Sequence, residues 1–379
     1  MTAQSKLEYL RAIRTRYLRV GKKFKSHILD EFCRICGYHR KYAIRRLRLG
    51  LPAPAPRRGS QPIYGNAGLL ALKRVWFAAE QLCSTRLKAA LPLWLPFYET
   101  TYGVLAPDVR QRLLAMSPAT IDRLLKPTRL QEARRRRSGT RPGRWLKNQI
   151  PLRTDNDDIT APGFVEADTV AHCGEALSGN FVWSLTFTDS YSGWTELRAV
   201  WNKGATDVLA ALREMETGLP FALRGFDCDN GSEFLNFHLW RFWIERPVPL
   251  KVTRTRPYHK NDNAHVEQKN WTHVRQLLGY GRFDNPAVVP LLNQLYRDSW
   301  GALHNFYCPS VKLQSKRREG SRWVKRHDAP RTPYQRLLAS GQLEPLAAQR
   351  LRQRYERLDP FELKQEIERK LRQIFAKLR

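Results

Sequence analysis

The stretch Arg224-Gly-Phe-Asp-Cys-Asp-Asn-Gly-Ser-Glu-Phe234 decides how the rest of the chain is interpreted. A mostly apolar run over residues 221–226 leads into two aspartates and stops at Asn230-Gly231. This pattern predicts a buried strand that ends in a tight turn and leaves the carboxylate of Asp229 at its tip. A carboxylate beside a glycine, which lets ligands approach the backbone, suits a divalent metal ion. The alternative is that Asp-Asn-Gly is only a surface turn.

Length and composition narrow the function. The chain has 379 residues, enough for two or three domains, and its 66 Lys and Arg exceed its 35 Asp and Glu. The formal net charge of +31 predicts a polyanionic partner, with nucleic acid as the first candidate. An apolar run long enough to span a membrane is lacking, which disfavours a membrane partner. Six scattered cysteines and the lack of a signal peptide indicate a reducing compartment such as the cytoplasm.

The charge is unevenly distributed along the chain. Residues 1–150 carry 32 basic and 8 acidic side chains, residues 151–310 carry 15 and 19, and residues 311–379 carry 19 and 8. A solubilising surface would not need so large an excess in the first part. An acidic middle between basic flanks is typical of a metal-using catalytic core between DNA-binding arms.

Residues 1–50 are predicted to form an N-terminal DNA-binding domain. Apolar spacing predicts helices over residues 6–20 and 24–36, and a basic helical pattern resumes after Gly37. Helix, turn and basic helix is the helix-turn-helix order, in which the second helix enters the major groove. An ordinary helical hairpin with a basic face is the alternative. The expected DNA contacts are Arg40, Lys41, Arg45 and Arg46.

Two cysteines of this domain allow a second interpretation. Cys33 and Cys36 lie between His27 and His39, which permits a structural zinc site. Both cysteines fall on the predicted helix just before the turn, where small buried side chains are needed. We therefore expect core cysteines.

Two linkers flank a second helical domain. Residues 51–66 are a Pro- and Arg-rich linker, and residues 67–130 are predicted to form a second helix-turn-helix domain, with Ser117-Pro118 opening its last helix. The Arg-rich linker over residues 131–160 cannot form a core, so it is either an arm that follows DNA phosphates or a solvated connection. The arginines expected to contact DNA are Arg134, Arg135, Arg136, Arg137, Arg141 and Arg144.

Residues 161–310 are predicted to form the catalytic core. Three strands are expected first, then a helix, two further strands and two long helices. Their predicted ranges are 164–170, 181–188, 194–201, 205–215, 221–228, 250–253, 263–280 and 286–305. This is the order of an α/β ribonuclease H-like fold, a mixed five-stranded sheet covered by helices.

Three carboxylates can be placed on this core. Asp168 lies within the first strand, Asp229 ends the fourth, and Glu267 lies early on the long helix. Adjacent strand ends and a helix packed on the sheet could bring them together to hold two Mg²⁺ or Mn²⁺ ions. Two such ions activate a water or a 3′-hydroxyl and stabilise the leaving oxygen in phosphoryl transfer. Of the neighbouring acids, Glu166 is expected to form a salt bridge and Asp189 to shape a turn.

Three motifs resemble the catalytic core of retroviral-integrase-like DDE transposases of bacterial insertion sequences. They are Glu166-Ala-Asp168-Thr, Asp229-Asn-Gly-Ser-Glu-Phe234 and Arg256-Pro-Tyr-His-Lys-Asn-Asp-Asn-Ala-His-Val-Glu267-Gln-Lys-Asn270. The resemblance implies that Asp168, Asp229 and Glu267 are the catalytic metal ligands and that Asn270 faces the DNA end. It also implies that the basic flanking domains bind the terminal inverted repeats and that the protein works at the bacterial nucleoid.

The sequence departs from this family at the DNA-gripping lysine expected after the catalytic Glu. Trp271 and Val274 occupy the corresponding positions, and Lys269 and Arg275 are possible substitutes. The gap between Asp229 and Glu267 predicts a long loop over residues 254–263 that closes over DNA. Its expected DNA contacts are Arg254, Arg256 and Lys260.

Residues 311–379 are predicted to form a basic, helical C-terminal region. Its basic stretch, residues 316–326, is either a DNA contact or a solvated loop. A final amphipathic helix over residues 360–378 either mediates self-association or packs on its own chain.

These features predict a transposase that binds the terminal inverted repeats, cleaves DNA and joins the ends to target DNA. It would act as a homo-oligomer on double-stranded DNA, because two DNA ends must be held together. Two alternatives stay open: a metal-dependent nuclease on the same fold, and a DNA-binding regulator with an inactive core.

Overall fold

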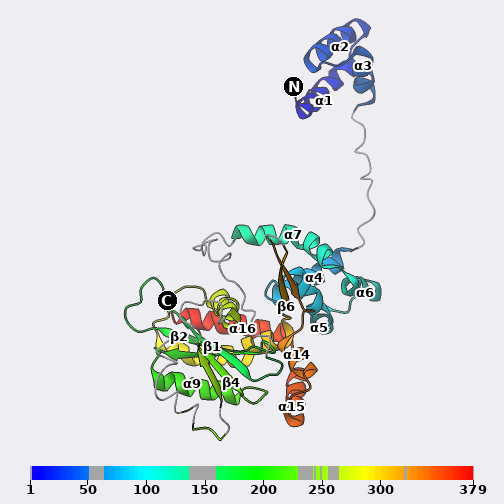
Figure 1. Cartoon of the computed structure of the whole chain (residues 1–379). Helices are drawn as coiled ribbons and strands as arrows, with labels where there is room; N and C mark the ends of the chain where they lie inside the picture. Colours follow the sequence, from blue (N-terminus) through cyan, green and yellow to red (C-terminus); the bar gives the residue numbers. More distant parts are fainter. Residues whose placement is uncertain are drawn as a thin grey trace. The chain divides into compact units, whose positions relative to one another are not determined.

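The computed structural model describes residues 2–50, 64–135, 159–228, 242, 245–247, 250–254, 264–319 and 322–378. The chain divides into two compact units, Met1–Ile63 and Tyr64–Arg379. Figure 1 labels many of the elements of both units. Among the described helices, none combines the length and the apolar character needed to cross a membrane.

The first unit contains three helices around a small core. They are α1 (Ala3–Arg19), α2 (Lys22–Cys36) and α3 (Arg40–Leu49). Phe32 and Leu47 are fully buried in this core, and Cys36 is 1% exposed beside them. Gly37 ends α2 in the left-handed conformation, φ 67°, and donates its N–H to the carbonyl of Cys33. The three predicted helices and the core position of Cys36 are confirmed.

In the second unit, the helices before the sheet share a core with the end of the chain. They are α4 (Asn66–Ala78), α5 (Ser84–Tyr102), α6 (Pro107–Ala115) and α7 (Pro118–Arg135). Trp94 is fully buried, with its ring perpendicular to that of Phe361 at 5.2 Å between centroids. Glu80 forms an ion pair with Lys364. Residues far apart in sequence therefore build one hydrophobic core.

The sheet has the strand order β3-β2-β1-β4-β5. Its strands are β1 (Phe164–Ala171), β2 (Val182–Asp189), β3 (Thr195–Trp201), β4 (Gly225–Cys228) and β5 (Lys251–Arg254). β1, β2 and β3 pair antiparallel, whereas β4 and β5 run parallel to β1. Parallel pairing needs a crossover, and α9 (Ala205–Thr217) lies between β3 and β4 in the chain. This mixed sheet with helices fits the predicted ribonuclease H-like core.

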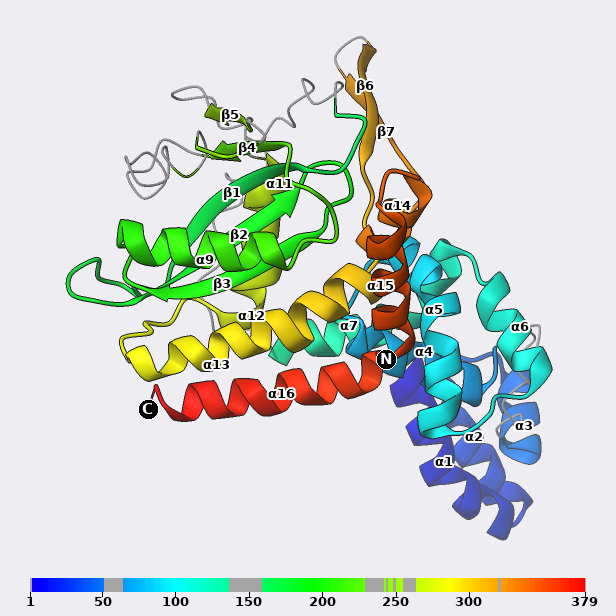
Figure 2. The same cartoon turned by 90° about the horizontal axis from the view of Figure 1, so that it is seen from below.

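Helices cover both faces of the sheet (Figure 2). Val208 and Met215 of α9 are fully buried in one core with Phe187 and Phe226. The other face is covered by the helices after β5. These are α11 (Ala264–Lys269), η1 (Asn270–Arg275), α12 (Gln276–Leu278), η2 (Pro286–Val288), α13 (Val289–Gln294), η3 (Leu295–Trp300) and η4 (Leu303–Tyr307).

The two long helices predicted over residues 263–280 and 286–305 are therefore not regular. Three of their segments, η1, η3 and η4, are π-helical. Apolar spacing locates a helix but does not report which backbone carbonyl each N–H reaches, so π turns escape a prediction from periodicity.

The C-terminal region is only partly helical, which corrects the prediction. It begins with a hairpin of β6 (Leu313–Glu319) and β7 (Arg322–His327), followed by α14 (Pro333–Ala339), α15 (Pro345–Glu356) and α16 (Pro360–Ala376). The hairpin was missed because its strands carry charge rather than an apolar alternation. On α16, Leu363, Ile367 and Ile374 are buried in the core that also holds Trp94 and Trp300. The final helix packs on its own chain, and its apolar face is used there.

Candidate active site

The β1–β4 register aligns the positions before two predicted carboxylates. Glu166 pairs with Asp227, and Ala167 pairs with Cys228. Asp168 is the next residue of β1, and Asp229, the next residue after β4, lies outside the described residues. The described strand pairing therefore extends to the residue before each of these two aspartates.

A glycine allows this pairing to begin. Gly163 has φ +114°, and a Cβ there would lie 2.5 Å from the Ala222 carbonyl oxygen. Its own carbonyl accepts N–H groups from Arg224 at 2.8 Å and from Gly225 at 3.0 Å. The start of β4 is thus tied to the start of β1 at a distance that a side chain would not permit.

Asp189 shapes the adjacent turn, as predicted. Its side chain is 1% exposed, and burial raises its pKa. One carboxylate oxygen accepts the N–H of Gly163 at 2.9 Å, and the other accepts the N–H of Ser192 at 2.6 Å and its hydroxyl at 2.5 Å. Asp189 is therefore a structural residue at the edge of the site.

Glu166 docks α11 on the sheet. Its side chain is 3% exposed and accepts the N–H of Val266 at 3.2 Å and the hydroxyl of Ser190 at 3.1 Å. An anion in the first turn of a helix also interacts favourably with the helix dipole. Glu166 thereby fixes the start of α11 over β1, one residue before Glu267. The backbone of Glu267 is described in α11, but its side chain lies outside the described set.

Asn270 provides the second contact between this helix and β1. Its Nδ2 donates to Oδ2 of Asp168 at 2.6 Å, while Oδ1 of Asp168 accepts the N–H of Thr169 at 2.7 Å. Oδ1 of Asn270 is buried without a hydrogen-bond partner among the described residues. An acceptor oxygen beside a carboxylate fits a hard cation such as Mg²⁺, which prefers oxygen ligands. The described contact of Asn270 orients Asp168, and its position facing the DNA end stays a prediction.

Arg275 provides a third contact. Its guanidinium donates to the Ala171 carbonyl at 3.0 Å and lies over the ring of Tyr280 at 4.8 Å. These contacts hold the helix to β1 rather than reaching outward. Lys269, the other candidate for gripping DNA, is half-buried, and desolvation, reinforced by the charge of Arg86, lowers its pKa to about 7.

The remaining predicted DNA contacts are placed as follows. On α3, Lys41 and Arg45 are exposed, whereas Arg40 forms an ion pair with Asp30 and Arg46 lies over the ring of Tyr42 at 5.7 Å. The other predicted DNA contacts lie outside the described residues or have side chains outside them: Arg134, Arg135, Arg136, Arg137, Arg141, Arg144, Arg254, Arg256 and Lys260. Among the described side chains, which include His27, Cys33, Cys36 and His39, no three His, Cys, Asp or Glu groups lie together as metal ligands.

Two residues that position Glu166, namely Lys312 and Ser190, had no signal in the sequence. Lys312 donates to the Ser190 carbonyl at 2.5 Å and to the Tyr191 carbonyl, and the Ser190 hydroxyl in turn donates to Glu166. Burial lowers the pKa of Lys312 to about 8. Contacts between residues more than 120 positions apart have no local pattern that could predict them.

Comparison with known proteins gives one relative and a group of structural neighbours. The chain is 40% identical to the uncharacterized protein y4rM of Sinorhizobium fredii over 336 residues, which cover 88% of this chain and 95% of that protein. No family model matches the chain.

The structural neighbours include two retroviral integrase catalytic cores. The core of HTLV-2 integrase, in complex with magnesium and in a trimeric form, aligns at 14% identity and a TM-score of 0.28, over 38% of this chain and 85% of that one. The core of BIV integrase aligns at 15% identity and a TM-score of 0.30, over 48% and 97%.

Proposed function

The chain belongs to the family of the uncharacterized protein y4rM, and we propose that it is a DNA transposase with a three-carboxylate active site. In this proposal Asp168, Asp229 and Glu267 hold two Mg²⁺ or Mn²⁺ ions. The protein binds the terminal inverted repeats of a mobile element, cleaves at their ends and joins them to target DNA, working as a homo-oligomer on double-stranded DNA.

The observation that carries this proposal is the docking of α11 on β1. Glu166 receives the N–H of Val266, and Asp168 receives the side chain of Asn270 one helical turn later. The backbone of Glu267 lies between these two contacts, and β4 is paired with β1 up to Cys228, the residue before Asp229. This arrangement supports a shared site for the three acids, which a purely structural role of α11 would not require.

The chain's own residues would prepare the reaction. Bound metal ions would activate the attacking water or 3′-hydroxyl and stabilise the leaving oxygen. Asn270 holds the Asp168 carboxylate in one orientation through its 2.6 Å hydrogen bond, and its buried Oδ1 has no hydrogen-bond partner among the described residues. Glu166 keeps the helix that bears Glu267 at a constant distance from β1. Such supporting contacts typically matter as much as the ligands themselves.

The basic flanks support DNA as the substrate. Residues 1–150 carry a large excess of positive charge, and the α3 side chains of Lys41 and Arg45 are exposed in a three-helix unit. Cations on an exposed helix face contact phosphates and base edges when the helix enters a groove.

The test uses the full chain with labelled terminal-repeat DNA and a supercoiled plasmid, in Mg²⁺ or Mn²⁺. Joined products support the transposase, nicking alone supports a nuclease, and binding without either supports a regulator. Asp168→Asn should abolish joining, because it removes a negative charge from the metal site. Asp207→Asn, an exposed position on α9, makes the same chemical change elsewhere and should leave joining intact. Normal joining by the Asp168 variant would overturn the proposed mechanism.

A further inference from the structure

The β6–β7 hairpin is a two-stranded ribbon without a core of its own. In Figure 2 it projects away from α14 and α15. Every described side chain of β7 is exposed except that of Val324, which is half-buried. A two-stranded hairpin is only marginally stable in water. A projecting ribbon that is exposed on both faces buries little apolar surface, so it contributes little to the stability of the fold. We therefore looked for a ligand that the ribbon could bind.

The ribbon is strongly cationic. Residues 313–327 contain six Lys and Arg, one Glu and one His. Glu319 is engaged by Arg317 at 2.6 Å, so little negative charge is left to oppose the others. A short segment with this excess of positive charge matches a polyanion and disfavours an apolar or basic partner.

Both faces of the ribbon carry positive charge. Arg318 pairs with Trp323 and Glu319 pairs with Arg322 in the register, and side chains of opposed residues project to the same face. Lys325 therefore shares a face with Trp323, which is 56% exposed, whereas Arg322 and Arg326 share the other face. A ligand that contacts both faces at once must surround the ribbon, as the two walls of a groove do.

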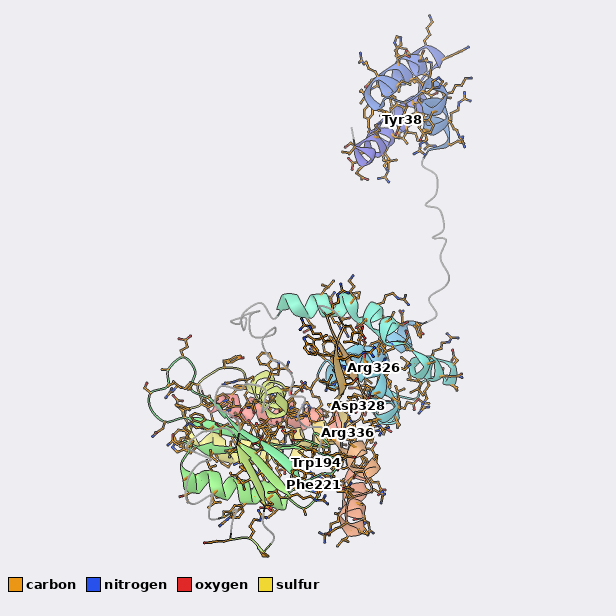
Figure 3. The ribbon with its side chains drawn as sticks, in the orientation of Figure 1. Tyr38, Trp194, Phe221, Arg326, Asp328 and Arg336 are labelled. Atoms are coloured by element: carbon orange, nitrogen blue, oxygen red, sulfur yellow. The ribbon has the colours of Figure 1, made fainter. Side chains whose placement is uncertain are left out.

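The root of the ribbon is held by hydrogen bonds and an ion pair. Lys312 and Asp328 bracket the hairpin: the Lys312 N–H donates to Oδ1 of Asp328 at 2.6 Å, and the Asp328 N–H donates to the Lys312 carbonyl at 2.9 Å. Arg336, 8% exposed, forms an ion pair with Asp328 and donates to the Ser310 carbonyl at 2.8 Å. Figure 3 labels Asp328 and Arg336 at this root, with Arg326 farther along the strand.

The root is also connected to the candidate active site. The Lys312 ammonium donates to the Ser190 carbonyl, and the Ser190 hydroxyl donates to Glu166, two residues before Asp168. Two strand residues span about 7 Å, so the ribbon is anchored close to Asp168. Its seven-residue strand can reach roughly 24 Å from that anchor, at about 3.4 Å per residue.

We propose that the β6–β7 ribbon is a duplex-binding arm that enters a groove of DNA. The major groove admits a two-stranded ribbon, and cations on its two faces then meet the phosphates on both walls. The inference rests on the proposed function for the identity of the nucleic acid as DNA. The arm adds contacts to the duplex at a fixed distance from the cleavage site, independent of the N-terminal helices.

The test is duplex binding by the full chain in EDTA, where no chemistry can occur. The probe is a short fluorescein-labelled DNA duplex of mixed sequence, titrated at several salt concentrations and followed by anisotropy. Arg322→Ala/Lys325→Ala/Arg326→Ala should lower the slope of log K against log salt by two to three units, since each phosphate contact contributes about 0.9. The control is Arg350→Ala/Arg352→Ala/Arg357→Ala, which removes equal charge from exposed positions on and just after α15.

A salt slope equal to that of the control triple variant would overturn the inference. It would also be overturned if the variant lost affinity only for duplex RNA, or if light scattering showed that only self-association had changed. Acetylation of Lys325 on the wild-type chain gives a second measurement that does not depend on variants. Its rate should fall at least several-fold when duplex is present, and an unchanged rate would refute the arm. Because binding is measured without cleavage, failure of joining and failure of the arm are distinguished.

Discussion

Replacing Glu166 with alanine should release the start of α11 from the sheet. Glu166 is 3% exposed and accepts hydrogen bonds from Val266 at 3.2 Å and from Ser190 at 3.1 Å. A hydrogen bond to a charged group contributes about 1.5–3 kcal/mol, and these two are long for charge-assisted bonds, so the lower value applies to each. We expect the free energy of unfolding of the Tyr64–Arg379 unit to fall by about 3 kcal/mol.

The assay can be confined to that unit. All 11 tryptophans of the chain follow residue 63, so urea unfolding monitored by tryptophan fluorescence reports on the second unit alone. Hydrogen exchange should also accelerate in the peptide that covers residues 264–270. Glu166→Gln keeps an acceptor oxygen and should lose less stability, and Glu175→Ala, at an exposed position, should change neither measurement.

The reasoning would be refuted by a specific pair of results. If Glu166→Ala unfolds at the same urea concentration as wild type and exchanges normally over residues 264–270, Glu166 does not dock α11. If stability falls but exchange in that peptide is unchanged, the lost energy belongs to the Ser190 contact and not to the helix.

Two further predictions concern the sheet. Gly163→Ala places a Cβ 2.5 Å from the Ala222 carbonyl oxygen at φ +114°, so we expect the free energy of unfolding to fall by about 2 kcal/mol or more in the same urea assay. The control is Gly281→Ala, which has open space around it. Equal stability of the two variants would contradict the close approach at Gly163. His172 is fully buried, with Nε2 2.8 Å from the Ser184 hydroxyl, and burial lowers its pKa to about 3. The unfolded chain binds this proton near pH 6.5 and the folded chain does not, so stability should fall by about 1.4 kcal/mol per unit as pH drops from about 6.5 towards 3; an unchanged slope in His172→Gln would show that another group is responsible.

The sequence predicts the strands of the core well because each carries its own signal. Strand β2 is apolar or β-branched at nearly every position, and the turn at Ser192-Gly193 separates it from β3. The partners of these strands have no such signal. The Asp168–Asn270 hydrogen bond joins residues 102 positions apart, and only the docking of the helix on β1 creates it.

For the β6–β7 hairpin, the strands themselves were not predicted from the sequence. Its residues are mostly Lys, Arg and Ser, so a prediction from apolar periodicity assigns them to a solvated loop. The strand pairing is instead anchored at its root by Lys312, Asp328 and Arg336, where Asp328 accepts the backbone N–H of Lys312 and forms an ion pair with Arg336. Charge in a sequence predicts exposure, but not that a few paired charges can hold an exposed ribbon in place.

The backbone placement of Glu267 follows from a match between two repeats. Along β1, the helix is held at positions 166, 168 and 171, and along the helix at positions 266, 270 and 275. Two strand residues span about 7 Å, and four helical residues rise about 6 Å, so one strand repeat and one helical turn nearly coincide. Helix and strand can therefore run side by side through the first two contacts without strain. Glu267 lies one residue after the first contact and three before the second, so its backbone has little freedom relative to Asp168.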